Sequence, residues 1–195
     1  TSKLKSRLMI LLIFAVGAAP AIAAIVWYFN ADSWRPTATT NHGELIRPPR
    51  QVATAPLPLL DGGTLPADWF QTQWSLVYAG PADCPRRCKK ALYLTRQIRL
   101  ALGAKMNRVQ RLFIVTGPTP QPAALRRAHP DLTVVEAAGP AGRNFLAQFT
   151  GGDGLGDHIW LVDPRGRLMM VYRLGEDPTG IIADLEHLLK YSQLG

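Results

Sequence analysis

Two cysteines, Cys84 and Cys88, are the only thiols in this 195-residue chain, and they stand four residues apart. On a helix this spacing puts both sulfurs on one face, close enough to bind one soft metal ion or to form a disulfide. A third residue, His158, follows Asp157 far along the chain and could supply an imidazole ligand. Two thiolates and one imidazole form a soft, three-coordinate set that suits Cu(I). These three residues are therefore the candidate metal ligands, and the two cysteines are the candidate redox pair.

Zinc and a purely structural disulfide explain the cysteines less well. Structural zinc sites take four ligands, commonly with a second cysteine pair, and this chain has no second pair. An oxidising compartment tends to pair two cysteines, so an inert disulfide is the alternative. However, a bridge between Cys84 and Cys88 closes so short a loop that it constrains the unfolded chain little. We therefore interpret the pair as functional, in copper binding or in thiol–disulfide exchange.

Positive charge surrounds the two sulfurs. The neighbouring basic residues are Arg86, Arg87, Lys89 and Lys90. Nearby cations and a helix N-terminus both favour thiolate over thiol, which assists metal binding and disulfide exchange alike. Because Cys84 lies nearer the expected helix start, we predict that it is the more exposed and more reactive sulfur.

An apolar segment, Leu8–Phe29, contains no charged residue. Twenty-two residues rising 1.5 Å each give about 33 Å, enough to cross a hydrocarbon core about 30 Å thick. Basic residues precede the segment and are expected to stay in the cytoplasm. We therefore expect a single-pass protein of the bacterial inner membrane, with its C-terminal domain in the periplasm. The alternative is a cleaved signal peptide, for which Ala21-Ile22-Ala23 would be the cleavage site.

The remainder of the chain suits a linker and one domain. Residues 1–30 are expected to form the anchor, residues 31–56 a linker stiffened by Pro48-Pro49, and residues 57–195 a domain with its own core. His42 lies in this linker with no partner in view.

The chain is basic, with a formal net charge of +8. Nucleic acid is excluded as a partner, because a domain outside the cytoplasm rarely meets any and the basic residues lack interleaved stacking aromatics. We expect the charge to act toward anionic lipid or an acidic protein partner. The alternative is a generally solvated basic surface with no specific partner.

Strands and helices alternate through the domain. Strands are expected at 57–60, 74–79, 109–115, 132–135, 159–162 and 168–172. Helices are expected from Asp83 or Cys84 to 102, and at 122–128, 143–149 and 178–191. This order, with the cysteines at the strand-to-helix junction after residue 79, indicates an α/β thioredoxin-like domain behind one N-terminal transmembrane helix.

Two motifs in this arrangement resemble those of a known family. The strand Trp74–Ala79 leads into Cys84-Pro-Arg-Arg-Cys88, and Asp157-His158-Ile-Trp-Leu-Val leads into the turn Asp163-Pro-Arg-Gly166. Together with the membrane anchor, these motifs resemble the Sco/SenC copper-delivery proteins of cytochrome c oxidase assembly, over about residues 57 to 190. The segment Asn41–Pro49 resembles a part of divergent small membrane proteins related to Sco.

The resemblance implies that Cys84, Cys88 and His158 bind copper, as Cu(I) or Cu(II). It further implies a membrane-anchored metallochaperone or thiol reductant that assists assembly of the copper centre of cytochrome c oxidase subunit II, with that subunit's copper domain as partner. A copper-delivery protein is not an enzyme, although Cys84 and Cys88 could carry out thiol–disulfide exchange.

Two alternatives remain open. One is a non-catalytic single-span accessory subunit or assembly scaffold of the oxidase. The other is a periplasmic thiol–disulfide oxidoreductase, although such proteins usually carry two residues between their cysteines, whereas this chain has three.

Overall fold

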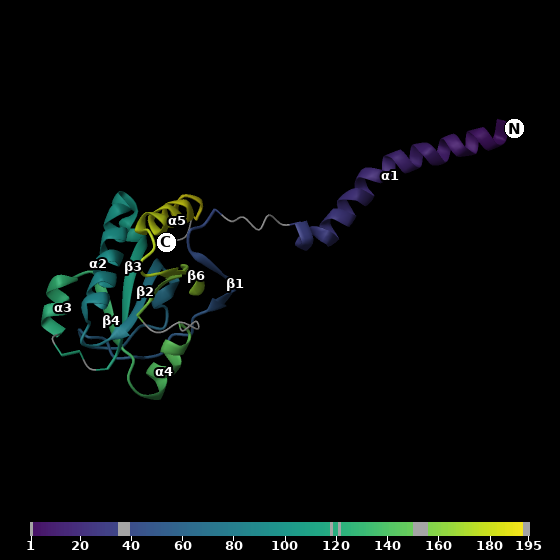
Figure 1. The fold of residues 1–195 in the computed structure, drawn as a ribbon. Coiled ribbons are helices and arrows are strands. Elements are labelled where there is room, and N and C mark those ends of the chain that lie inside the picture. Colours follow the sequence, from purple (N-terminus) through teal and green to yellow (C-terminus); the bar gives the residue numbers. More distant parts are fainter. Residues whose placement is uncertain (1, 35–39, 118, 121, 150–155, 193–195) are drawn as a thin grey trace. The chain divides into compact units, whose positions relative to one another are not determined.

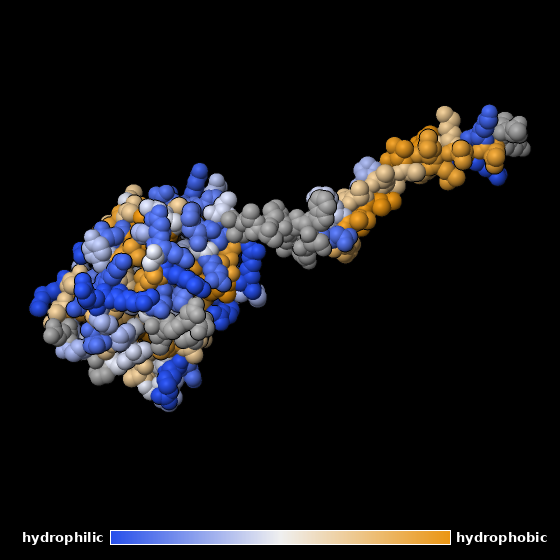
Figure 2. Space-filling model, in the orientation of Figure 1, coloured by the Kyte–Doolittle hydropathy of each residue, from blue (hydrophilic) through white to orange (hydrophobic). Residues whose placement is uncertain are grey.

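A computed structural model describes residues 2–34, 40–117, 119–120, 122–149 and 156–192. The chain divides into two units, Thr1–Thr40 and Asn41–Gly195. The first unit carries α1, Ser2–Trp34, in which Leu4–Asn30 is long and apolar enough to cross a membrane. Figure 2 shows this helix covered by hydrophobic side chains. It is a candidate membrane span, as the apolar segment Leu8–Phe29 predicts.

The second unit is built on one six-stranded sheet (Figure 1), with strand order β1-β6-β5-β2-β3-β4. Strands β2, β3 and β4 pair in parallel, whereas β5 pairs antiparallel to β2, β6 to β5, and β1 to β6. The bounds are Glu44–Gln51 for β1, Trp74–Pro81 for β2, Val109–Thr116 for β3, Leu132–Glu136 for β4, His158–Val162 for β5 and Arg167–Arg173 for β6.

Helices cover both faces of this sheet. Their bounds are Arg86–Ala101 for α2, Pro122–Ala128 for α3, Gly139–Ala147 for α4 and Pro178–Tyr191 for α5, with short 3₁₀ turns at Trp69–Gln71 and Gly103–Arg108. Helices α2 and α5 bury apolar side chains against one face, and α4 buries Phe145 against the other. The α/β thioredoxin-like fold class expected from the sequence is confirmed.

Strand β2 lies in the middle of the sheet and contributes to both faces. Leu76 and Tyr78 point to the side of α2 and α5, whereas Val77 and Ala79 point to the side of α4. This alternation is the normal consequence of the two-residue period of a strand. It decides which side chains can meet the cysteines.

The segment expected as a linker contains an additional strand. Strand β1 lies within 31–56 and pairs with the edge of the sheet at β6, with a register shift between Leu45 and Arg50. The strand expected at 57–60 is replaced by isolated bridges at Pro58 and Leu59. Both differences arise because pairing with a distant strand, rather than local pattern, decides the conformation of these segments.

The residues just before β1 are held by α5. The backbone N–H groups of His42 and Gly43 donate to the carboxylate of Asp184, at 2.9 and 3.0 Å, and the hydroxyl of Tyr172 donates to it at 3.2 Å. Gly43 fits because a Cβ there would collide with the ring of Tyr172. His42, for which the sequence shows no partner, therefore hydrogen-bonds to buried Asp184 through its backbone N–H, and its imidazole Nδ1 lies 3.2 Å from the same carboxylate.

Candidate functional site

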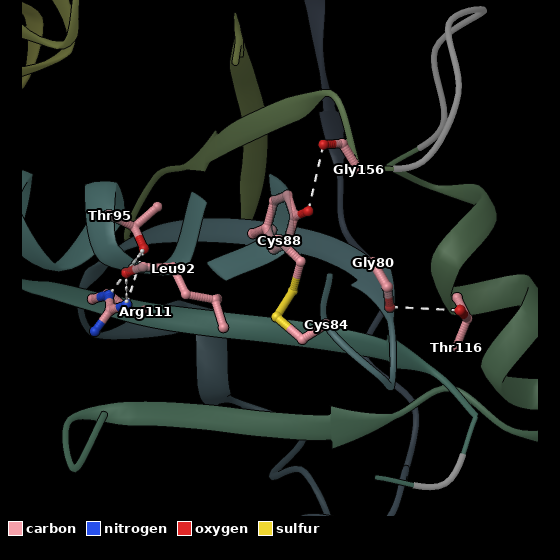
Figure 3. Close-up of a disulfide and its surroundings, with 9 residues drawn as sticks. Gly80, Cys84, Cys88, Leu92, Thr95, Arg111, Thr116 and Gly156 are labelled. Atoms are coloured by element: carbon pink, nitrogen blue, oxygen red, sulfur yellow. Dashed lines mark hydrogen bonds between the residues drawn. A yellow bond between two sulfur atoms is a disulfide. The ribbon is translucent and has the colours of Figure 1, made fainter. Parts of the chain in front are cut away.

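Cys84 and Cys88 form a disulfide at the junction between β2 and α2, with their Cα atoms 5.0 Å apart (Figure 3). Cys84 lies in the loop after β2, and Cys88 lies in the first turn of α2. The sequence spacing therefore predicts correctly that the two sulfurs come together. Strand β2 leads to the pair at one end of the sheet, and α2 carries Cys88.

The local backbone explains why α2 begins at Arg86 rather than at Asp83 or Cys84. Cys84 has a positive φ of 41° and donates its N–H to the carbonyl of Pro81 at 3.1 Å, which closes a turn. Pro85 is extended and forms the N-cap, and its carbonyl accepts the N–H of Lys89 at 3.0 Å. The first sulfur thus lies in the loop beside the positive end of the helix dipole.

The two cysteine residues differ slightly in exposure. Cys84 is 8% exposed and Cys88 1%, and both pack in an apolar cluster with Tyr78 and Phe113. Both cysteines are buried, and Cys84 is the less buried of the two, so it is the better candidate for the sulfur that reacts with a client in thiol–disulfide exchange. Cys88 is shielded by the helix and the sheet.

Tyr78 forms part of the apolar surface against which the cysteines pack. Its hydroxyl donates to the carbonyl of Gly156 at 3.4 Å, as the dashed line to Gly156 in Figure 3 marks. Burial raises the pKa of Tyr78 to about 12, with Arg87 lowering it and Asp157 raising it. Tyr78 is therefore neutral near pH 7. Sequence reasoning did not assign it to the site, although its place in the strand before Cys84, two residues along from buried Leu76, is the signal that could have done so.

An ion pair crosses from the start of α2 to the start of β5. The guanidinium of Arg87 lies 2.6 Å from the carboxylate of Asp157; the Arg87 side chain is largely exposed and that of Asp157 is half-buried. Arg86, Lys89 and Lys90 are exposed on the same helix turns. The surroundings of the disulfide are therefore basic, as expected from the sequence, with Asp157 neutralising one of the four cations.

A buried arginine of β3, Arg111, hydrogen-bonds to α2 beyond the turn that carries Cys88. Arg111 donates to the carbonyl of Leu92 at 2.6 Å, to the hydroxyl of Thr95 at 3.0 Å, and to the carboxylate of Asp131 at 3.1 Å (Figure 3 shows the first two). Its side chain is fully buried. This cluster holds the helix that carries Cys88.

His158 lies on the other face of the sheet. In the pairing of β2 with β5, Tyr78 is opposite Ile159 and Val77 is opposite Trp160. Side chains alternate along β5, so His158 shares the face of Trp160, whose ring centroid is 5.9 Å from that of His158. Cys88 instead packs against the face of Tyr78.

The structure therefore joins two of the three expected ligands and separates the third. Among the residues that it describes, which include all three, no group of three or more His, Cys, Asp and Glu side chains is arranged to hold a metal ion. Both sulfurs are also engaged in the disulfide. The assignment of Cys84, Cys88 and His158 as copper ligands stays a prediction.

Comparison with solved structures shows where this fold recurs. Yeast Sco1 with copper bound is 18% identical, with a TM-score of 0.60 over 80% of this chain and 96% of that chain. Bradyrhizobium japonicum ScoI with copper bound is 21% identical, with a TM-score of 0.54 over 74% and 98%. The thioredoxin domain of a thiol-disulfide oxidoreductase from Bacteroides vulgatus is 18% identical, with a TM-score of 0.55 over 72% and 97%.

These likenesses show a thioredoxin-like fold shared with copper-binding and thiol-exchanging proteins. No match was found among curated protein sequences. One family model, described as the transmembrane-like, thioredoxin-like, C-terminal domain, matches residues 74–192, which is more than half of the chain. The matched region contains the disulfide, the buried arginine cluster and all strands except β1. The chain therefore belongs to the family of transmembrane-like proteins with a thioredoxin-like C-terminal domain.

Proposed function

We propose that this protein is a membrane-anchored thiol–disulfide exchange protein, with Cys84 and Cys88 as its reactive pair. The observation that carries this proposal is the Cys84–Cys88 disulfide itself: it joins the loop after β2 to the first turn of α2, and Cys84 is the less buried of its two residues. An α1 anchor in the bacterial inner membrane and a domain in the periplasm would place this pair in a compartment that permits disulfides.

The exchange step uses the difference between the two sulfurs. In the reduced protein, the Cys84 thiolate attacks one sulfur of a client disulfide, forms a mixed disulfide and releases the other client sulfur as a thiolate. The Cys88 thiolate then attacks the Sγ of Cys84, which restores the internal disulfide and releases the second client sulfur. Two electrons pass to the client, and the two protons lost by this protein's thiols balance those taken up by the client thiolates.

The surroundings of Cys84 favour its part in this step. The N-terminal end of α2 and the cations of its first turns stabilise a thiolate relative to a thiol, which increases the reactive fraction near neutral pH. An upstream dithiol donor would reduce the pair again after each turnover. As client we propose the copper domain of cytochrome c oxidase subunit II, which the resemblance to the Sco/SenC proteins supports.

The exchange proposal predicts different outcomes for the two cysteine substitutions. With reduced full-length protein in detergent and oxidised glutathione as the probe, Cys88→Ser is expected to accumulate a stable mixed disulfide at Cys84, since no second thiol can release it. Cys84→Ser is expected to react at least about tenfold more slowly, because the remaining sulfur is shielded. Mass spectrometry of the quenched protein measures both species. Equal rates for the two variants would contradict these roles.

Copper carriage is a second candidate function, favoured by the similarity to two Sco structures that hold copper. After reduction, two thiolates would remain side by side and could take Cu(I) as cargo. The position of His158 on the opposite face of the sheet supports a site made by the two cysteines alone.

The copper proposal predicts that reduced protein binds one Cu(I) and that Cys88→Ser abolishes tight binding. His158→Ala is expected to leave the affinity within about threefold of the parent, because the imidazole lies away from the sulfurs. An anaerobic Cu(I) titration against a competing chelator measures both variants. A hundredfold loss in His158→Ala would instead establish the three-ligand site that the sequence predicts.

A further inference from the structure

The basic residues of this chain are strongly segregated. Between positions 84 and 130 the sequence contains no Asp or Glu. The same stretch contains eleven basic residues: Arg86, Arg87, Lys89, Lys90, Arg96, Arg99, Lys105, Arg108, Arg111, Arg126 and Arg127. This stretch forms α2, β3 and α3, so the charge is concentrated on one part of the fold.

Several of these cations are already used within the domain. Arg99 and Arg111 pair with Asp131, Arg87 pairs with Asp157, and the guanidinium of Arg108 donates to carbonyls near the end of α5. The other seven have no carboxylate partner in the part of the chain that the structure describes. Their charge is available to an external partner.

On α2, exposed apolar side chains lie among these cations. Helical spacing places Lys89, Tyr93, Arg96 and Leu100 along one stripe of α2. Tyr93 is 61% exposed and Leu100 46%. Arg96 donates to the carbonyl of Ala128 at 3.2 Å and so joins this stripe to α3.

Helix α3 adds exposed Arg126 and Arg127. We call the six side chains Lys89, Tyr93, Arg96, Leu100, Arg126 and Arg127 the basic face. Figure 2 shows strongly hydrophilic side chains over the region where Figure 1 places α2 and α3.

We propose that the basic face binds the surface of an anionic lipid bilayer. Clustered Lys and Arg side chains are attracted to anionic headgroups, and exposed Tyr and Leu side chains among them can enter the headgroup–acyl boundary. The proposal is independent of the exchange chemistry, since none of the six side chains carries the reacting sulfurs.

The chain itself favours a bilayer over an acidic protein as the occupant. Its α1 helix is a candidate membrane span, and only six residues, 35–40, connect Trp34 to Asn41. Six residues can span at most about 20 Å, so insertion of α1 would keep the domain at a high effective concentration near lipid headgroups. Tyr93 and Leu100 are exposed among the cations. Such side chains suit the interfacial region of a bilayer, whereas an acidic protein could be bound by the cations alone.

The test compares full-length protein in nanodiscs of phosphatidylcholine with protein in nanodiscs that also contain phosphatidylglycerol. A neutral amine-acetylating reagent and mass spectrometry measure labelling of Lys89 relative to Lys190, which is exposed on α5. Anionic discs are expected to reduce this ratio at least threefold, and high salt is expected to restore it, because salt screens the attraction. An unchanged ratio in the two kinds of disc would overturn the proposal.

Two matched variants separate docking from general attraction. Arg126→Gln/Arg127→Gln is expected to abolish most of the protection of Lys89 from labelling in anionic discs. Arg143→Gln/Arg165→Gln removes the same charge at exposed positions outside the basic face and is expected to retain this protection. Tyr93→Ser/Leu100→Ser is expected to weaken protection at constant charge. Equal loss in both double arginine variants would show a diffuse charge effect, and protection that requires an added acidic protein would assign the face to that partner instead; either result overturns the proposal.

Discussion

Replacing Asp131 by alanine is expected to lower the free energy of unfolding by about 3–4 kcal/mol, because it leaves the fully buried guanidinium of Arg111 without its counterion. The thiol-bearing helix depends on this group, since Arg111 also donates to Leu92 and Thr95 of α2. We place the effect toward the lower end of the range for broken buried pairs because the Asp131 side chain is one-quarter exposed. Denaturant unfolding of the full chain in detergent measures it.

A paired variant distinguishes the lost counterion from lost packing. Arg111→Met removes the buried charge while filling much of its volume, so it is expected to cost far less stability than Asp131→Ala. If Arg111→Met destabilises the protein as much as Asp131→Ala, the loss of the guanidinium's hydrogen bonds, rather than an unpaired charge, is the main cause of the destabilisation.

The same pair gives a pH dependence with a defined sign. Burial would raise the pKa of Asp131, but the charges and hydrogen bonds of Arg111 outweigh it, with Arg99 adding to them, and the pKa is lowered overall. A carboxyl group with a depressed folded-state pKa stabilises the protein above its unfolded-state pKa, and this stabilisation disappears as the pH falls through the folded-state pKa. The acid-induced loss of stability is therefore expected to be smaller in Asp131→Ala than in the parent.

Asp184→Ala is expected to destabilise the domain by about 2–3 kcal/mol, because it leaves several hydrogen-bond donors without their acceptor. Asp184 accepts the backbone N–H groups of His42 and Gly43 and the hydroxyl of Tyr172. Without this acceptor, the segment before β1 should detach from α5, and its amide hydrogens should exchange faster. Hydrogen exchange of residues 42–51 measures this local release.

Glu186→Ala provides the control on the same helix, since Glu186 is exposed. It is expected to leave both stability and exchange of β1 unchanged. Fast exchange of β1 in the control as well would mean that the loss of a helix charge, rather than the loss of the buried acceptor, frees the segment.

Regular elements of the domain follow from local pattern. The buried stripe of α2, which includes Cys88, Ala91, Leu92, Thr95 and Ile98, has helical spacing and packs on the sheet as predicted. The bounds of α3 and α5 also agree with the expected 122–128 and 178–191. Helices α2 and α5 each bury one face, so the pattern of apolar residues contains the information that defines them.

Strand β1 could not be predicted in the same way. It is exposed along most of its length and contains Pro48-Pro49, features that are typical of a linker. Its conformation depends on pairing with β6, more than a hundred residues away along the chain. A local window contains no sign of that partner.

The candidate site was predictable in part for a related reason. The spacing of Cys84 and Cys88 is local, and a helix start brings them together. The side of the sheet that His158 faces depends on the register between β2 and β5, and a shift of one residue would reverse it. Nothing in the number of residues between Cys88 and His158 encodes that register.

The two ends of the sheet have a consequence for self-association. At the outer edge of β4, the N–H of Glu136 donates to the carbonyl of Pro58, and the carbonyl of Val134 accepts the N–H of Leu60. At the other end, β1 places Pro48 and Pro49 on the outermost strand, where they provide no N–H groups. Open strand edges recruit strands from other molecules and start aggregates, and natural proteins block them with prolines and covering segments. Each edge of this sheet therefore carries one of these protections, which would hinder growth of these domains into intermolecular sheets at high local concentration.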